Sequence, residues 1–125
     1  MNKNYLITTG GSGGHVIPAV ILYEHLSKDA KVIITTDKRG LKYLNDENYQ
    51  LRIIDTPRLN NIFLFPINLI LVIILIIKSY LLLKKNNIEK LFSTGGYMSF
   101  PLLLAAKFLR LKIYLVEPNQ VLGRA

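Results

Sequence analysis

A glycine-rich loop near the start of the chain constrains the fold more than any other feature. It separates a short apolar run, NYLITT (residues 4–9), from a segment with helical spacing that extends from His15 to about Leu26. Such a run indicates a strand, and the spacing after it indicates a helix whose first turn tolerates Pro18. Glycines cost conformational entropy on folding, so GGSGGH at this junction predicts that something must closely approach the bare backbone.

The remainder of the chain repeats this alternation of strand and helix. Strands are predicted at residues 31–36, 51–55, 88–93 and 112–116, and helices at residues 38–46, at 66–86 and from a Ser99 cap to about Arg110. Alternating elements predict an α/β fold, with a Rossmann-like parallel sheet and helices on both faces. With 125 residues, half of them hydrophobic, the chain suits one domain with a real core.

Three predicted loops follow the carboxyl ends of strands, at residues 10–15, 94–97 and 117–123. Ligands of parallel sheets bind at this edge. Gly10 and Gly11 would expose backbone N–H groups near a helix start, where phosphate is attracted. Gly95 and Gly96 repeat the arrangement, and Tyr97 adds a hydroxyl and an aromatic ring. Two such turns in one sheet favour a shared anionic ligand over two purely structural turns.

His15 is the side chain of the first loop that can exchange protons near neutral pH. A neutral imidazole there could accept a proton from a hydroxyl, or hydrogen-bond a phosphate or a sugar. The alternative is a histidine that only caps or packs, and the neighbouring glycines favour the functional interpretation. In the third loop, Glu117 and Asn119 suit sugar hydroxyls, although taken alone they are ordinary turn residues.

The first loop departs from two nucleotide-binding patterns. No Gly-Lys-Ser/Thr follows it, which excludes the nucleoside-triphosphate loop. If Gly11 and Gly13 begin a dinucleotide fingerprint, Val16 stands where the third glycine belongs. Asp37, after the second predicted strand, could serve as the ribose-binding acid, so a dinucleotide-binding domain stays open as an alternative.

Charge is concentrated in the second half of the chain. Residues 1–55 carry seven basic and six acidic side chains, whereas residues 56–125 carry nine basic and two acidic ones. A basic half indicates an anionic partner such as phospholipid headgroups or a phosphorylated substrate, and an ordinary solvated surface is the alternative. We expect no nucleic-acid partner, because the basic residues are not interleaved with aromatics. The chain has no cysteine, which excludes disulfides and thiolate chemistry.

An uncharged run of sixteen residues, 62–77, forms most of the long predicted helix. A membrane span needs about 20 residues, and crossing would place the two glycine turns of one sheet on opposite sides of the bilayer. We therefore expect a helix on the membrane surface, with Lys78, Lys84 and Lys85 facing anionic headgroups. A buried core helix and a spanning helix are the alternatives.

Three motifs in this order resemble the N-terminal domain of the MurG family, the peptidoglycan N-acetylglucosaminyltransferases with the two-domain GT-B fold. They are GGSGGHVIPA, STGGYMSFP and VEPNQVLGRA, and the resemblance covers nearly the whole chain. The third motif departs in detail, because Val116 and Pro118 stand where the family usually has histidine and glutamine.

The resemblance implies transfer of N-acetylglucosamine, with inversion, from UDP-N-acetylglucosamine to the C4 hydroxyl of a muramyl-pentapeptide on undecaprenyl pyrophosphate. It places the enzyme peripherally on the cytoplasmic face of the bacterial inner membrane, and we expect neither metal nor cofactor. The glycine turns would receive the acceptor pyrophosphate, and His15 would act in catalysis as a candidate base. The donor-contacting positions would be Ser12, Gly13, Gly14 and Asn119, and Glu117 is a candidate sugar contact.

Members of the family are much longer than this chain and carry most of the UDP site in a second domain. We therefore expect residues 1–125 to be an N-terminal acceptor-binding domain without its donor-binding C-terminal domain. The chain would be a fragment or one half of a split enzyme, inactive alone. A non-enzymatic alternative is a membrane-anchoring subunit that recruits a separate donor-binding chain.

Overall fold

A five-stranded parallel sheet organises the protein. The computed structural model describes residues 3–10, 13–44, 50–54, 63–95 and 99–116. The strands are β1 (Asn4–Thr8), β2 (Lys31–Thr36), β3 (Gln50–Ile53), β4 (Lys90–Ser93) and β5 (Lys112–Leu115). The helices are α1 (Gly13–Leu26), the 3-10 turn η1 (Gly40–Tyr43), α2 (Phe65–Lys85) and α3 (Phe100–Phe108). The strand order is β3-β2-β1-β4-β5, and all four neighbouring pairs are parallel.

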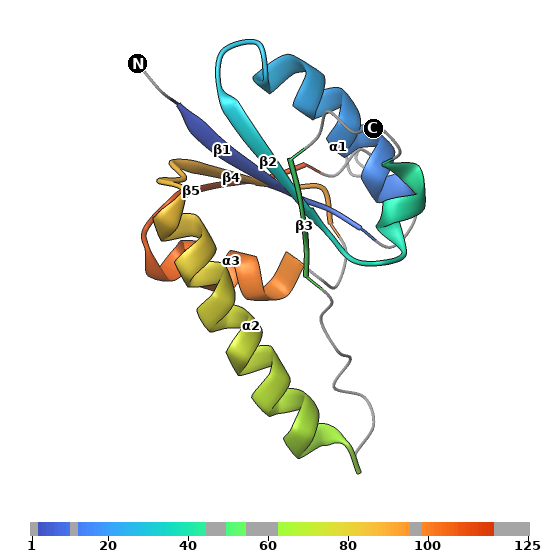
Figure 1. Ribbon diagram of the computed structural model, residues 1–125, viewed down its shortest axis with the longest axis vertical. Helices are drawn as coiled ribbons and strands as arrows, with labels where there is room; N and C mark the ends of the chain where they lie inside the picture. Colours follow the sequence, from blue (N-terminus) through green and yellow to red (C-terminus); the bar gives the residue numbers. More distant parts are fainter. Residues whose placement is uncertain (1–2, 11–12, 45–49, 55–62, 96–98, 117–125) are drawn as a thin grey trace, which may run out of the picture.

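Helices cover both faces of this sheet, as the sequence predicted (Figure 1). Successive strand residues point to opposite faces. Tyr5 and Ile7 therefore pack in one cluster with Val16 and Ala19 of α1. Leu6 points the other way, into a second cluster formed with α2 and α3. The sheet thus separates two apolar layers, as a doubly wound α/β fold requires.

Two helix starts differ from the sequence prediction. α1 begins at Gly13, two residues earlier than expected, so Pro18 lies inside the helix rather than in its first turn. Proline lacks the N–H that would otherwise bond to the Gly14 carbonyl. Ser99 precedes α3 but makes no side-chain capping bond, because its backbone is already helical (φ −74°, ψ −17°). A capping residue needs an extended backbone to aim its oxygen at the first turn.

The short helix predicted at residues 38–46 is reduced to the 3-10 turn η1. Its start is organised by Asp37, whose carboxylate accepts a hydrogen bond from the Gly40 N–H at 2.8 Å. A side chain at position 40 would overlap the Thr36 hydroxyl and approach the Gly10 Cα within 3.1 Å. The turn after β2 therefore packs directly against the backbone that follows β1.

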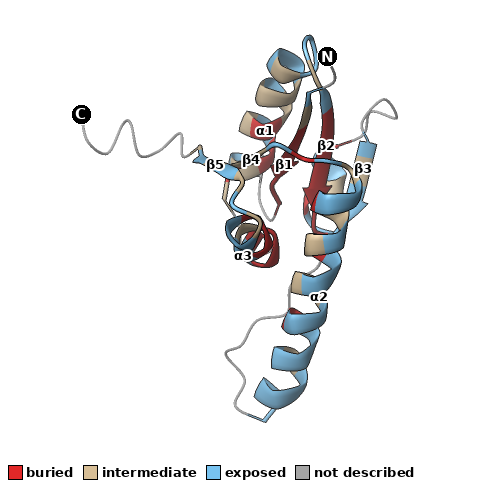
Figure 2. Cartoon of the chain, turned by 90° about the vertical axis from the view of Figure 1, so that its left-hand side faces the viewer, coloured by how far each residue is buried: buried red, intermediate tan, exposed pale blue. Residues whose placement is uncertain are grey.

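α2 has two unlike halves (Figure 2). Its C-terminal half packs on the sheet and α3, where Ser79 and Leu83 are buried. Its N-terminal half projects past the sheet and exposes apolar side chains (Figures 1 and 2). By length and composition alone α2 would suffice to cross a membrane, since it has 21 residues and contains an 18-residue window with a mean hydropathy of 2.4. That window is 17% buried. However, it connects β3 and β4, which lie in one sheet, and a crossing helix would separate them.

Candidate functional site at the carboxyl ends of β1 and β4

The strand order creates a switch point between β1 and β4. From β1 the chain passes through α1 to β2 on one side, whereas β4 lies on the other side of β1. In open parallel sheets, ligands bind at the carboxyl ends of strands where the order reverses in this way. Thr8 pairs with Ser93, so the two strands end at the same level. Gly10 and Gly95, from the two glycine turns, therefore follow neighbouring strand ends.

Two helices begin beside this switch point. α1 starts at Gly13 after β1, and α3 starts at Phe100 after β4. The first N–H groups of a helix have no acceptor within the helix, and together with the helix dipole they favour anions. Neither first turn contains an acidic side chain. The site therefore combines two positive helix ends with no carboxylate in the first turns to compete for them.

The His15 imidazole bridges the two strand ends. It lies in the first turn of α1, half-buried, and its Nδ1 is 3.0 Å from the backbone oxygen of Thr94. A carbonyl oxygen can only accept a hydrogen bond, so Nδ1 must carry the proton of the neutral ring. Nε2 is then the ring nitrogen with a free lone pair. This is the arrangement that a histidine base requires, with one nitrogen held and the other available to the substrate.

Gly95 makes room for that ring. It has φ +105°, a conformation that side-chain-bearing residues rarely adopt. A Cβ at this position would lie 2.9 Å from His15 Nδ1 and 3.0 Å from His15 Cε1. The sequence interpretation explained this glycine by ligand approach, but the structure shows that the imidazole itself occupies the space beside it.

Buried hydroxyls form a second set of polar groups here, which the sequence interpretation missed. The Thr94 hydroxyl donates to Thr9 Oγ1 at 2.6 Å and ties the two glycine turns together. The Thr8 hydroxyl donates to Ser99 Oγ at 3.2 Å, which links β1 to the start of α3. Thr35 is level with Thr8, and its buried hydroxyl has no hydrogen-bond partner among the described residues. The available signal was the repeated ending of apolar strands in threonine and serine.

Asp37, the candidate ribose-binding acid, makes contacts within its own turn. Asp37 is 6% exposed and lies just after β2. One carboxylate oxygen accepts from the Gly40 N–H at 2.8 Å, and the other is 3.3 Å from Arg39 Nε. These contacts hold the turn before η1 and give the carboxylate a structural role.

Several predicted site residues lie outside the described part of the chain. They are Gly11, Ser12, Gly96, Tyr97, Glu117 and Asn119. Among the described predicted residues, the structure brings Gly10, Gly14, His15 and Gly95 to one edge of the sheet. Gly13 is described as the first residue of α1. Within the same described ranges, no group of three or more histidine, aspartate or glutamate side chains could hold a metal ion.

Comparisons with known proteins agree with this fold. The Glycosyltransferase family 28 N-terminal domain matches residues 5–125. A crystal structure of Acinetobacter baumannii MurG superposes with a TM-score of 0.77 at 23% sequence identity, covering 92% of this chain and 35% of that one. At this identity the likeness concerns the fold.

Two curated relatives share the name UDP-N-acetylglucosamine--N-acetylmuramyl-(pentapeptide) pyrophosphoryl-undecaprenol N-acetylglucosamine transferase. The protein of Pelagibacter ubique (strain HTCC1062) is 52% identical over 126 residues, covering 100% of this chain and 35% of the relative. That of Rickettsia felis (strain ATCC VR-1525 / URRWXCal2) is 40% identical over 125 residues, covering 98% of this chain and 34% of the relative. The chain therefore spans about a third of the length of these relatives. The domain match over residues 5–125, together with these identities, shows that the chain belongs to glycosyltransferase family 28 and corresponds to its N-terminal domain.

Proposed function

We propose that this chain is the acceptor-binding half of a transferase that moves N-acetylglucosamine from UDP-N-acetylglucosamine to a muramyl-pentapeptide on undecaprenyl pyrophosphate. The observation that carries the proposal is the convergence of His15 and both glycine turns on one switch point. The 52% identity to the Pelagibacter ubique relative supports the choice of substrates. The remaining part of the enzyme, with most of the UDP site, would be supplied by a donor-binding domain.

At the switch point, the helix N–H groups and His15 would have different roles. The pyrophosphate of the acceptor would accept hydrogen bonds from the N–H groups at the starts of α1 and α3. His15 Nε2 would take the proton of the C4 hydroxyl as its oxygen bonds to the anomeric carbon. The bond from that carbon to UDP breaks on the opposite side, so the configuration inverts and UDP leaves with the electron pair.

A ligand titration separates this proposal from the dinucleotide-binding alternative. The chain should bind a short-chain, lipid-linked muramyl acceptor, and inorganic pyrophosphate should compete with it. It should not bind NAD measurably, because Val16 replaces the third glycine and Asp37 is held by its own turn. Calorimetry with each ligand provides the measurement, and NAD binding without acceptor binding would refute the proposal.

We also propose that the projecting half of α2 attaches the protein to the cytoplasmic face of the bacterial inner membrane without crossing it. A contiguous exposed apolar surface marks an interaction site. From Phe65 to Ile77, the exposed apolar side chains are Phe65, Ile67, Leu69, Ile70, Leu71, Ile73, Ile74 and Ile77. Lys78, Lys84 and Lys85 are also exposed and follow them along the helix, where they can meet anionic headgroups.

Vesicle sedimentation tests this attachment. Anionic vesicles should retain more protein than neutral ones, and high salt should release part of it. Replacing Ile67 and Ile70, which are 57% and 59% exposed, by serine should weaken vesicle binding by about tenfold or more, because roughly half of each side chain no longer gains from burial in lipid.

A matched control is available on α1. Ile17 and Ile21 are 57% and 55% exposed, so their replacement by serine makes the same chemical change on another helix. This double variant should bind vesicles as the parent does. Equal losses in both double variants would show that α2 is not the attachment surface.

A further inference from the structure

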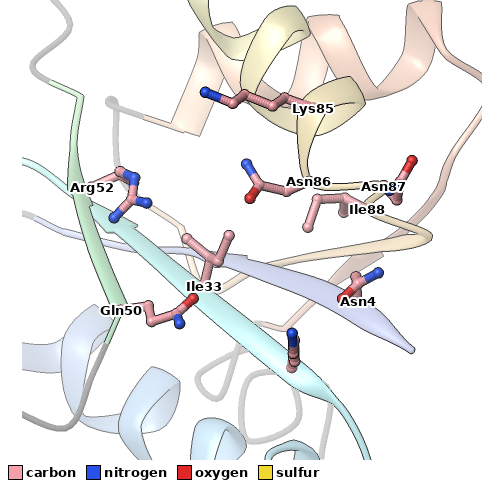
Figure 3. Close-up of a pocket in the computed structure, with 9 residues that line it drawn as sticks. Asn4, Ile33, Gln50, Arg52, Lys85, Asn86, Asn87 and Ile88 are labelled. Atoms are coloured by element: carbon pink, nitrogen blue, oxygen red, sulfur yellow. The ribbon is translucent and has the colours of Figure 1, made fainter. Parts of the chain in front are cut away.

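A basic pocket lies between strands β1, β2 and β3 and the end of α2 (Figure 3). It has a volume of about 430 Å³. Its lining consists of Asn4, Lys31, Ile33, Gln50, Arg52, Lys85, Asn86, Asn87 and Ile88. Residues of a strand rise about 3.3 Å each, so Asn4 at the start of β1 is about 13 Å from Thr8 at its end. Arg52 is in register with Thr35 and so with Thr8, but it lies two strands away from β1, and the described lining shares no residue with the switch point.

Three cationic side chains from three different elements line this pocket. Lys31 begins β2, Arg52 belongs to β3, and Lys85 ends α2. None of the described lining residues is acidic. Among the described residues, none of these three cations forms an ion pair. The three side chains give the pocket a positive charge, which a bound anion would neutralise.

The other lining groups suit an oxyanion. One guanidinium nitrogen of Arg52 donates to the Leu51 carbonyl at 3.0 Å, which leaves its remaining N–H groups for a ligand. Asn4, Gln50, Asn86 and Asn87 add neutral amides around the cations. The buried side chains of Ile33 and Ile88 supply an apolar wall. Guanidinium and ammonium groups with amide donors form a phosphate-recognising set.

We propose that this pocket binds a phosphate-bearing small molecule, independently of the acceptor site at the switch point. Its volume falls in the range of small-molecule sites and exceeds the needs of inorganic phosphate alone. A lipid headgroup carries the same phosphate chemistry, and the exposed apolar side chains of α2 continue to Leu81, one turn before Lys85. The experiment therefore has one arm for a free solute, the source proposed here, and one for a lipid headgroup.

Site-resolved NMR titration of the chain with inorganic phosphate, at constant ionic strength, tests the proposal. The backbone amides of Lys31, Arg52 and Asn87 should shift along a saturable curve. Replacing Lys31 and Arg52 by glutamine should weaken that binding by at least about tenfold, since each removes charge-assisted hydrogen bonds. Both side chains are exposed, so the fold should survive. Any shifts of Gly14 and Gly95 report the other site and should persist in this variant.

A double variant at Lys42 and Lys107, both replaced by glutamine, is the matched control, because it removes two exposed charges outside the pocket. It should retain the parent's affinity at Lys31, Arg52 and Asn87. Non-saturable shifts at these three amides, or equal affinity in the two double variants, would overturn the proposal.

A second arm distinguishes the source of the phosphate. In sedimentation with phosphatidylglycerol vesicles, the Lys31 and Arg52 double variant should bind like the Lys42 and Lys107 control if the ligand is a free solute. A selective loss of vesicle binding in the pocket variant, together with no saturable NMR response to phosphate, would overturn the proposed small molecule in favour of a lipid headgroup.

Discussion

His15→Ala should lower kcat by about 10²–10⁴-fold, the usual contribution of a positioned general base. The assay uses a chimera of this chain with the remainder of the Pelagibacter ubique relative, which is 52% identical over the shared part. The physical reason is the available Nε2, which the bond from Nδ1 to the Thr94 carbonyl leaves unprotonated in the neutral ring. The KM for UDP-N-acetylglucosamine should change little, because the proposed proton transfer involves the acceptor.

The separate kinetic constants decide what the histidine does. If His15 only clamps the acceptor phosphate, the KM for the acceptor rises and kcat suffers less. His25→Ala, at the exposed end of α1, is a control that should leave both constants unchanged. Activity of His15→Ala within about threefold of the parent would exclude both roles and leave the ring as a packing residue.

The layer structure could be predicted because it depends on local patterns. Apolar runs such as residues 31–36 and 88–93 indicate strands, and strands alternating with helices indicate a parallel sheet covered on both faces. The strand order could not be obtained in this way. It depends on the face to which each crossover turns, and the placement of β4 beside β1 is decided by packing between distant segments.

The site was predicted where it depends on residue type and was missed where it depends on register. The glycines and His15 stand out in the sequence. However, the partner of His15 is the carbonyl of Thr94, 79 residues away, and a backbone oxygen carries no sequence signal. The bond from Thr94 to Thr9 likewise requires the parallel pairing of β1 with β4.

The basic pocket also depends on register and packing rather than on residue type alone. Lys31, Arg52 and Lys85 are far apart in the sequence, and each looks like an ordinary solvated charge. They line one pocket because β2 and β3 pair in parallel and the end of α2 lies beside these strands. The charge distribution placed the excess of basic residues in the second half of the chain. Two of these three cations, Lys31 and Arg52, belong to the first half, so the distribution did not indicate this pocket.

Gly95→Ala should lower the activity of the same chimera by about 10²-fold, the cost expected when a catalytic group is misplaced by about 1 Å. The added methyl group would lie 2.9 Å from His15 Nδ1, so either the ring or the turn must move. The φ of +105° adds backbone strain of about 1–3 kcal/mol, which thermal or denaturant unfolding of the chain should detect as lost stability.

A double-mutant cycle separates the steric effect on His15 from damage to the glycine turn itself. If Gly95 acts by seating the imidazole, adding Gly95→Ala to His15→Ala should cause little further loss of activity, because the group it displaces is already gone. The backbone strain should still appear in the unfolding free energy, since φ is unaffected by the loss of the ring. A full and additive activity loss would mean instead that Gly95 itself contacts the acceptor, as the sequence first suggested, and that the imidazole only shares its space.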